Sequence, residues 1–284
     1  MGNGPLVWKH RTGELRLDRT HVMGVVNVTP DSFSDGGRHF EPAAAIRRTL
    51  QMANEGADLL DVGGESTRPR SDPVPAHEEW RRVGPVLEAV TRKLDVPISI
   101  DTRKPEIAEK ALQAGASIVN DVTGLRDPRM VGIIAQAGAG AVIMHMRGDP
   151  KTMQDDPRYE DVVRQVRDFL EERVRSASAN GVARESVAVD PGIGFGKSVA
   201  HNLTLLRGLG TIAAIGVPIV VGVSRKSFIG ALGGGEAGER LPGSLAAATL
   251  AVAHGAHVVR AHDVAETVRA MRVADAVLRG RENL

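Results

Sequence analysis

Short apolar runs of strand character recur along the chain, and nearly every run breaks off at a polar or charged residue. The eight runs lie near residues 22–27, 57–62, 97–101, 116–121, 141–145, 187–190, 217–223 and 256–261. The starts of neighbouring runs lie about 20 to 45 residues apart, which leaves room for the crossover helix that parallel strands require. The runs are almost continuously hydrophobic, as expected of strands buried on both faces. The pattern therefore predicts a parallel sheet built from repeated βα units.

Helical patterns with recognisable ends occupy the intervals between the runs. One begins at Pro42 and ends at Gly56, and another begins at Pro105 and ends at Gly115, since proline suits the first turn of a helix and glycine its end. The longest helix is expected over residues 159–180. This alternation predicts an α/β fold, and the number of runs favours a closed (β/α)₈ TIM barrel over a doubly wound open sheet.

A short β-hairpin is expected ahead of the barrel. Residues 6–17 alternate between apolar and polar positions around a turn at Thr12-Gly13-Glu14, and such a hairpin could cap the barrel floor. We therefore divide the chain into a hairpin extension, residues 1–20, and a single barrel domain, residues 21–284. Long polar loops, which are commonly functional on a barrel rim, are expected at residues 29–39, 63–76, 146–158 and 229–243.

Composition and charge narrow the class of protein further. The formal net charge is +1 with acidic and basic residues interspersed, so no electrostatic footprint for nucleic acid is visible. The absence of cysteine excludes disulfides, thiolate metal sites and thiol nucleophiles. The longest apolar stretch, residues 245–259, contains His254 and is too short to span a membrane. We expect a cytoplasmic protein that binds small molecules and neither nucleic acid nor a membrane.

Four carboxylates stand at the ends of apolar runs, where a (β/α)₈ barrel would bring them to one rim. They are Asp61, Asp101, Asp121 and Asp190, with Asn120 beside them. Any one of them alone is as readily a helix cap as a ligand. Together they suit a flat heterocycle with an amidine-like edge, because a carboxylate accepts two parallel hydrogen bonds from such an edge.

Basic side chains follow the last two runs, at Arg225, Lys226, Arg260 and His262. Each alone is more often a surface charge, but barrels commonly bind phosphate in the loops after strands seven and eight. The set therefore predicts an anion site. His145, which ends the fifth run, suits a buried core histidine slightly better than a site group.

No spacing typical of a protein-held zinc ion is present. A Mg²⁺ ion held mainly by the phosphates of a substrate, with one oxygen from Asn27, needs no such motif. The glycine-rich run 192–197 lacks the full Walker A pattern, so it is not interpreted as a phosphate loop.

Longer segments now become specific enough to compare with known families. They are residues 23–37 and 61–69, then 99–102, 119–122, 144–146, 190–197, 222–227 and 260–263. In this order they resemble the signature segments of the bacterial dihydropteroate synthases, a family of pterin-binding enzymes. The resemblance runs from about residue 22 to the C-terminus and includes every strand end.

The resemblance implies a (β/α)₈ transferase that condenses 6-hydroxymethyl-7,8-dihydropterin diphosphate with p-aminobenzoate in folate biosynthesis. Its products would be 7,8-dihydropteroate and diphosphate. It also implies a homodimer, Mg²⁺ as cofactor with Asn27 as the protein's ligand to the metal, and competition by sulfonamides.

The resemblance also implies roles for individual residues. The pterin would contact Asp101, Asn120, Asp190 and Lys226. The diphosphate would contact Asn27, Thr67, Arg68, Arg260 and His262. The p-aminobenzoate would contact Phe33, Thr67, Pro69, Phe195 and Ser227. Catalytic roles would fall to Asp101, Lys226, Arg68 and Asp35.

The implied mechanism is an SN1-like displacement in which the carbon–oxygen bond breaks ahead of attack by the aryl amine. The site would then stabilise a cationic pterin and an anionic diphosphate at once. Two alternatives remain open. A methyltetrahydrofolate:corrinoid methyltransferase shares the barrel and the pterin grip but needs no diphosphate clamp, and a pterin-binding paralogue would bind without turnover.

Overall fold

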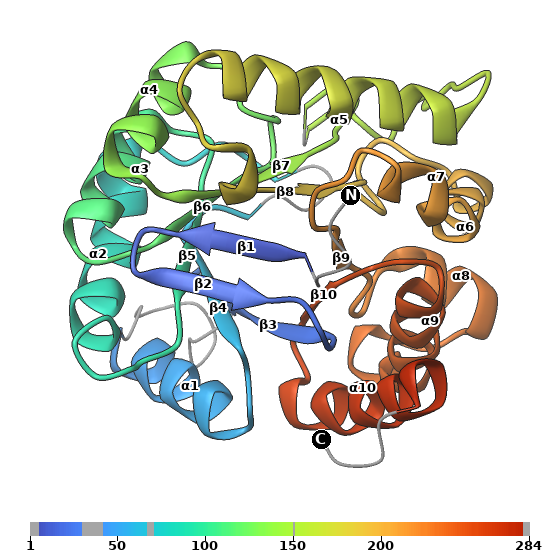
Figure 1. Ribbon diagram of the computed structural model, residues 1–284. Coiled ribbons are helices and arrows are strands. Elements are labelled where there is room, and N and C mark those ends of the chain that lie inside the picture. Colours follow the sequence, from blue (N-terminus) through green and yellow to red (C-terminus); the bar gives the residue numbers. More distant parts are fainter. Residues whose placement is uncertain (1–5, 30–41, 67–70, 150, 281–284) are drawn as a thin grey trace.

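The computed structural model describes residues 6–29, 42–66, 71–149 and 151–280 of the chain. Within these ranges a ring of parallel strands is surrounded by helices (Figure 1). The strands are β3 (His21–Asn27), β4 (Leu59–Gly63), β5 (Ile98–Asp101), β6 (Ile118–Asp121), β7 (Gly140–Met144), β8 (Val187–Asp190), β9 (Val220–Gly222) and β10 (Val258–Ala261). Each coincides with one of the apolar runs, although the ends differ by up to three residues.

The ring closes between β8 and β9. Hydrogen-bonded ladders join the strands in the order β8-β7-β6-β5-β4-β3-β10-β9. A parallel bridge between Val189 and Ile219 joins the two ends, and the Val189 N–H donates to the Pro218 carbonyl oxygen at 2.8 Å. The predicted (β/α)₈ barrel is therefore confirmed, and the open sheet is excluded.

Helices α1 to α10 surround the strands. Their bounds are α1 (Pro42–Asn54), α2 (Ala76–Val90), α3 (Pro105–Gln113), α4 (Pro128–Ala137), α5 (Val162–Ala179), α6 (Val199–Arg207), α7 (Leu209–Ala213), α8 (Ser227–Gly233), α9 (Leu241–Ala253) and α10 (Val264–Arg279). Helix α5 starts three residues later than expected, because the Asp161 side chain accepts the Arg164 N–H and caps the helix there. No helix in the described ranges has the length and apolar character needed to cross a membrane.

The expected loop over residues 229–243 is wrong in its first part. Residues 227–233 form α8, and a short 3₁₀ turn, η2 (Ala237–Glu239), follows. The glycines of this segment are poor helix formers, so the sequence predicts a loop. The helix forms because Phe228 and Ile229 pack into the hydrophobic core. Helix α8 begins directly after Lys226, so it places that side chain on the rim.

The hydrophobic core has two layers because side chains alternate along each strand. One set packs outward against the helices. The other fills the barrel interior and comprises Trp8, Leu17, Met23, Leu59, Ile118, Val142, Ala188, Val220 and Val258. Two of these, Trp8 and Leu17, come from the N-terminal segment, so that segment completes the interior packing.

The N-terminal hairpin lies across the floor of the barrel (Figure 1). Strands β1 (Val7–His10) and β2 (Gly13–Arg16) pair antiparallel, with His10 opposite Gly13. The turn therefore falls at residues 11–12, slightly before the expected position. The Arg11 N–H donates to the Ser117 carbonyl oxygen just before β6. The hairpin thus seals the end of the barrel opposite the rim that carries the polar strand ends.

Trp8 provides a test of this seal. Its side chain is fully buried, and its indole N–H donates to the Ser186 carbonyl oxygen at 3.0 Å. Trp8→Phe keeps most of the apolar bulk but leaves that carbonyl without its donor, so we expect a loss of about 1–2 kcal/mol in the free energy of unfolding. Urea denaturation measures the loss. The same change at the partly exposed Trp80 is the control, and an equal loss there would contradict the assignment.

Candidate active site

The C-terminal ends of β4, β5 and β10 meet in one charge cluster, in which Asp61, Asp101 and Arg260 are ion-paired. The Arg260 guanidinium donates from Nε to Asp61 Oδ2 at 2.6 Å and from Nη2 to Asp101 Oδ2 at 2.8 Å. From the end of β6, Asn120 Nδ2 donates to the same Asp61 oxygen at 3.0 Å. One carboxylate oxygen thus orients both a guanidinium and an amide at the rim.

Asp61 had no assigned role in the sequence interpretation, and the structure identifies it as the centre of this cluster. Its side chain is fully buried, and its Oδ1 has no hydrogen-bond partner among the described residues. A buried carboxylate is costly unless it is paired. The only sequence signal for it was its position at the end of an apolar run, which a helix cap would share.

The surroundings of Asp101 shift the pKa of its carboxyl group toward neutrality. Burial raises the pKa of Asp101 to about 7, and the nearby Asp61 carboxylate adds to that rise, whereas Arg260 opposes it. A group that titrates near neutrality on a barrel rim is typical of a functional site.

Lys226 and Asp190 form the opposite side of the rim. Lys226 Nζ donates to the Ile193 carbonyl oxygen at 2.6 Å and lies 4.1 Å from the centre of the Phe195 ring. Burial lowers the pKa of Lys226 to about 8, and Asp190 opposes the shift. Burial also raises the pKa of Asp190, whose Oδ1 accepts the Gly192 N–H at 2.7 Å. Lys226 interacts electrostatically with both Asp190 and Asp101, and Asp101 is paired with Asn120 in the β5–β6 ladder. The four residues predicted for the pterin therefore lie near one another.

The glycine-rich loop over residues 191–197 follows β8 and turns back on itself. Gly192, Gly194 and Gly196 have φ of +67°, +84° and +60°, a region that glycine adopts without strain. A Cβ on Gly192 would lie 1.9 Å from the His145 carbonyl oxygen, so no other residue fits there. Lys197 ends the loop and is buried under it. The sequence interpretation rejected a Walker A loop here, and it assigned Lys197 no role.

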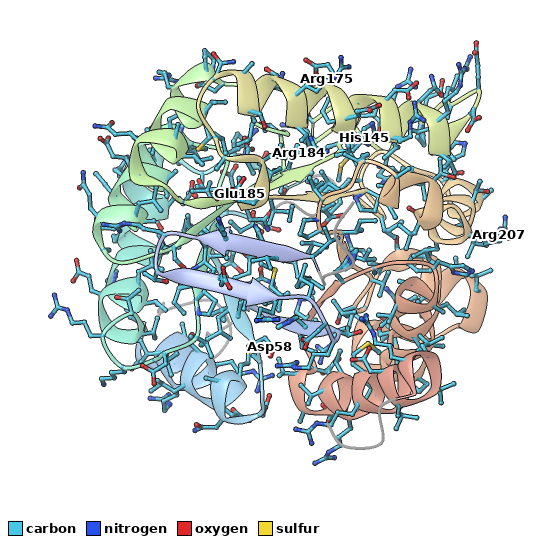
Figure 2. The ribbon with its side chains drawn as sticks, viewed as in Figure 1. Asp58, His145, Arg175, Arg184, Glu185 and Arg207 are labelled. Atoms are coloured by element: carbon cyan, nitrogen blue, oxygen red, sulfur yellow. The ribbon has the colours of Figure 1, made fainter. Side chains whose placement is uncertain are left out.

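His145 and Asp121, which remained without a role in the sequence interpretation, are structural in the described ranges. His145 lies beside α5 (Figure 2). Its ring packs edge-on against that of Phe169 on this helix, with the centroids 5.0 Å apart. Burial, together with the charge of Lys197, lowers the pKa of His145 to about 2, so the ring is neutral. The Asp121 carboxylate accepts the N–H groups of Thr123 and Leu125 and therefore holds its own loop.

The residues predicted for the diphosphate are only partly brought together. Asn27 Nδ2 and His262 Nε2 are 3.5 Å apart, and His262 Nδ1 lies 3.0 Å from Ser224 Oγ. Arg260, in contrast, is directed at the two carboxylates. Arg225 pairs with Asp263, its Nε donating to Oδ2 at 3.0 Å. The diphosphate roles therefore stay predictions.

The predicted p-aminobenzoate residues Phe195 and Ser227 both border Lys226: the ring of Phe195 faces its ammonium, and Ser227 begins α8. The remaining predicted site residues belong to the loops after β3 and β4, and they lie outside the described residues. These are Phe33, Asp35, Thr67, Arg68 and Pro69.

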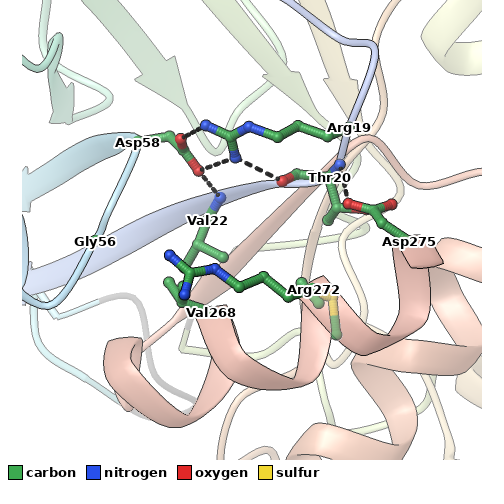
Figure 3. Close-up of a pocket in the computed structure, with 9 residues that line it drawn as sticks. Arg19, Thr20, Val22, Gly56, Asp58, Val268, Arg272 and Asp275 are labelled. Atoms are coloured by element: carbon green, nitrogen blue, oxygen red, sulfur yellow. Dashed lines mark hydrogen bonds and ion pairs between the residues drawn. The ribbon is translucent and has the colours of Figure 1, made fainter. Parts of the chain in front are cut away.

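A cavity of about 220 Å³ lies at the opposite end of the barrel, between the start of β3 and α10 (Figure 3). Three of its charged lining groups, Arg19, Asp58 and Asp275, are already paired. Asp58 accepts the Val22 N–H at 2.8 Å and also binds Arg19, and Asp275 accepts the Thr20 N–H at 2.7 Å. Because active sites of this fold lie at the other end, this cavity is not a candidate.

Comparison with known proteins agrees with the rim geometry. Residues 23–262 match the model of a family described as pterin binding enzyme. Dihydropteroate synthase of Escherichia coli K12 is 46% identical over 269 residues, 95% of each chain.

Two solved structures are similar over nearly their whole length. The Xanthomonas albilineans dihydropteroate synthase with 4-aminobenzoic acid has a TM-score of 0.88 at 49% identity, covering 93% of this chain and 95% of that one. The Yersinia pestis dihydropteroate synthase in a sulfonamide drug complex has a TM-score of 0.91 at 40% identity, covering 97% and 100%.

The fold and the charged rim define a barrel enzyme whose site suits a flat, hydrogen-bonding heterocycle. The chain belongs to the pterin binding enzyme family. Within that family it is similar to dihydropteroate synthases over more than nine-tenths of its length, and the resemblance stated from its sequence segments is confirmed.

Proposed function

We propose that this protein is a dihydropteroate synthase, which joins 6-hydroxymethyl-7,8-dihydropterin diphosphate to p-aminobenzoate and releases diphosphate. The observation that carries the proposal is the rim itself. Asp101, Asn120 and Asp190 stand at strand ends and Lys226 at the start of α8, in a chain that is 46% identical to such an enzyme over 269 residues. The relatives and solved structures reported above are dihydropteroate synthases, which favours this activity over that of a corrinoid methyltransferase.

The pterin would be held through its polar edges. The amidine-like edge donates two parallel hydrogen bonds, and the Asp190 carboxylate is the acceptor that suits it. Asn120 has one of its amide N–H groups occupied by Asp61, so its orientation is fixed before substrate arrives. Lys226 supplies a donor to the carbonyl side of the ring. Preorganisation of this kind lowers the entropy lost on binding.

The charge distribution suits a reaction in which the pterin becomes transiently cationic. The carbon–oxygen bond breaks with its electron pair going to diphosphate, the amine nitrogen of p-aminobenzoate then bonds to the same carbon, and the amine loses a proton to water. The negative charge of Asp101 would stabilise the positive charge on the ring. The side of the rim that carries Asn27 and His262 would face the leaving group. Fixed charges of this kind are a major source of catalysis.

The p-aminobenzoate would lie beside Lys226, where Phe195 offers an aromatic face and Ser227 a hydroxyl. The Xanthomonas relative binds 4-aminobenzoic acid and the Yersinia relative a sulfonamide drug. We therefore expect sulfonamides to inhibit this protein competitively with p-aminobenzoate. Inhibition that p-aminobenzoate cannot relieve would contradict this placement.

Mg²⁺ fits the rim as an ion held mainly by the substrate's diphosphate. The described residues contain no group of three or more His, Asp or Glu side chains able to hold it by themselves. Asn27, half-buried beside His262, offers an amide oxygen as the protein's ligand. When bound, the ion would neutralise charge on the departing diphosphate.

The homodimer and the cytoplasmic location also stay proposals. Helices α9 and α10 carry exposed apolar side chains at Leu250, Val273 and Val277, and burial of such residues between two copies is favourable. Sedimentation at micromolar concentration distinguishes a dimer from a monomer.

The function is tested by supplying both substrates with Mg²⁺ and measuring diphosphate release together with formation of 7,8-dihydropteroate. Stoichiometric release of both products is expected. No release would reject the proposal and favour a non-catalytic binding protein, and methyl transfer to an added corrinoid would favour the methyltransferase.

A further inference from the structure

Lys197 is a buried cation at the base of the glycine-rich loop, and the proposed reaction does not use it. The residue is 3% exposed. Its Nζ is 3.0 Å from His145 Nδ1, 2.9 Å from the Gly192 carbonyl oxygen and 2.9 Å from the Phe195 carbonyl oxygen. An ammonium group has three N–H donors, so each has an acceptor.

These contacts are unusual because no carboxylate is hydrogen-bonded to the ammonium among the described residues. Burying an ammonium costs several kcal/mol unless good acceptors compensate. Here the acceptors are one imidazole nitrogen from the end of β7 and two carbonyl groups of the 191–197 loop. Burial lowers the pKa of Lys197 to about 7, while Asp190 opposes the shift. The ammonium thus ties the loop to the neighbouring strand.

The same loop supplies the surroundings of Lys226. The Ile193 carbonyl oxygen accepts from Lys226 Nζ, and the Phe195 ring lies beneath it. The two residues whose carbonyl groups Lys197 holds, Gly192 and Phe195, flank Ile193 and Gly194. A shift of the loop would therefore move the ring of Phe195 together with the Ile193 carbonyl group that accepts from Lys226.

We infer that Lys197 is a positioning residue, which fixes the 191–197 loop against His145 so that Ile193 and Phe195 hold Lys226 for the pterin and shape the p-aminobenzoate side. The inference rests on the proposed synthase function, which it deepens. Lys197 itself touches neither substrate. Lys197 would position groups that contact the substrates equally in the ground state and the transition state. Loss of Lys197 would therefore raise KM more than it lowers kcat.

Lys197→Met removes the donors while keeping a chain of similar length. We expect KM for p-aminobenzoate and for the pterin diphosphate each to rise about tenfold, and kcat to fall less than threefold, since tenfold corresponds to roughly one displaced hydrogen bond. Lys197→Arg keeps the cation and is expected to recover part of the loss. Lys9→Met, an exposed lysine on the hairpin, is the matched control and should change neither constant.

A second variant keeps the test decisive if Lys197→Met does not fold. Tyr159 Oη donates to the Gly196 carbonyl oxygen at 3.0 Å, so this partly buried side chain is a second tether of the same loop. Tyr159→Phe removes this tether with little change in packing. A two- to fourfold rise in the same two KM values is expected, on the order of a weaker neutral hydrogen bond.

Nitrogen NMR of labelled histidine provides a readout that is independent of activity. The His145 Nδ1 signal should shift in Lys197→Met, because that nitrogen loses its partner, and it should stay unchanged in Lys9→Met. Unchanged KM values in both loop variants of an active protein, or a loss confined to kcat, would overturn the inference. If the parent protein releases no diphosphate, the proposed function fails, and an unmoved Nδ1 signal would then overturn the loop contact as well.

Discussion

Asp101→Asn is expected to lower kcat/KM for dihydropteroate formation by roughly 10² to 10³, the usual loss when one fixed electrostatic contact to a transition state is removed. Asparagine keeps the shape of the side chain and can still accept from Arg260. It removes the negative charge that would face the pterin as positive charge develops there. Steady-state kinetics measures the loss.

Its control is the same substitution at Asp127, the partly exposed N-cap of α4, where asparagine caps a helix equally well. Asp127→Asn should leave kinetics and thermal unfolding unchanged. Equal activity of Asp101→Asn and the parent would remove Asp101 from the mechanism, whatever binds at the rim.

The pH dependence offers a second readout for Asp101. Burial raises the pKa of its carboxyl to about 7, so the proportion of charged carboxylate falls as the pH is lowered through that value. The parent's kcat/KM should therefore decline below about pH 7. The residual activity of Asp101→Asn should lack this decline, because asparagine does not titrate. A decline that persists in the variant must come from another group.

The strand ends could be predicted from the sequence, whereas the partners across the rim could not. A buried parallel strand is a local signal, since its apolar run and polar end lie within a few residues. The Arg260 contacts reach Asp61 and Asp101, which lie 199 and 159 positions away. No local sequence pattern indicates contacts between residues so far apart in the chain. The sequence therefore predicts a diphosphate role for Arg260 and not its pairing with these carboxylates.

Lys197 shows a different limit. The glycines of the run 192–197 are visible in the sequence, but the need for them depends on the backbone just after β7. A Cβ on Gly192 or Gly196 would collide with the carbonyl oxygen of His145 or Arg147 there. The direction of the Lys197 side chain, inward under its own loop, follows from that packing. Comparison with a Walker A pattern could exclude one function but could not identify this one.

Arg260→Met is expected to lower the free energy of unfolding at pH 8 by about 3–5 kcal/mol, the usual cost of removing one partner from a buried ion pair. Asp61 is fully buried and, among the described residues, would keep only the Asn120 amide as a donor. Asp101 would lose the cation that now opposes its protonation. Arg207→Met, at an exposed arginine on α6, is the control and should change stability by less than about 0.5 kcal/mol.

The loss should be smaller at pH 5 than at pH 8. The pKa of Asp101 in the folded protein already exceeds its ordinary value of 3.8, and removal of Arg260 raises it further. The folded state then binds more protons than the unfolded state, so stability falls as the pH rises through the folded pKa. Urea denaturation at both pH values measures the difference, and equal losses would show that the cost does not arise from the protonation of Asp101.

Adding Asp61→Asn to Arg260→Met separates the remaining explanations. If the cost of Arg260→Met comes from an unpaired buried carboxylate, neutralising Asp61 should restore part of the stability, and the double-mutant cycle should give a coupling of about 1–3 kcal/mol. Activity should not return with stability, because the double variant has lost both the guanidinium and the carboxylate that orients Asn120. Recovery of stability without recovery of turnover would show that the Asp61–Arg260 pair serves to orient the side chains of the rim and not to stabilise the folded protein.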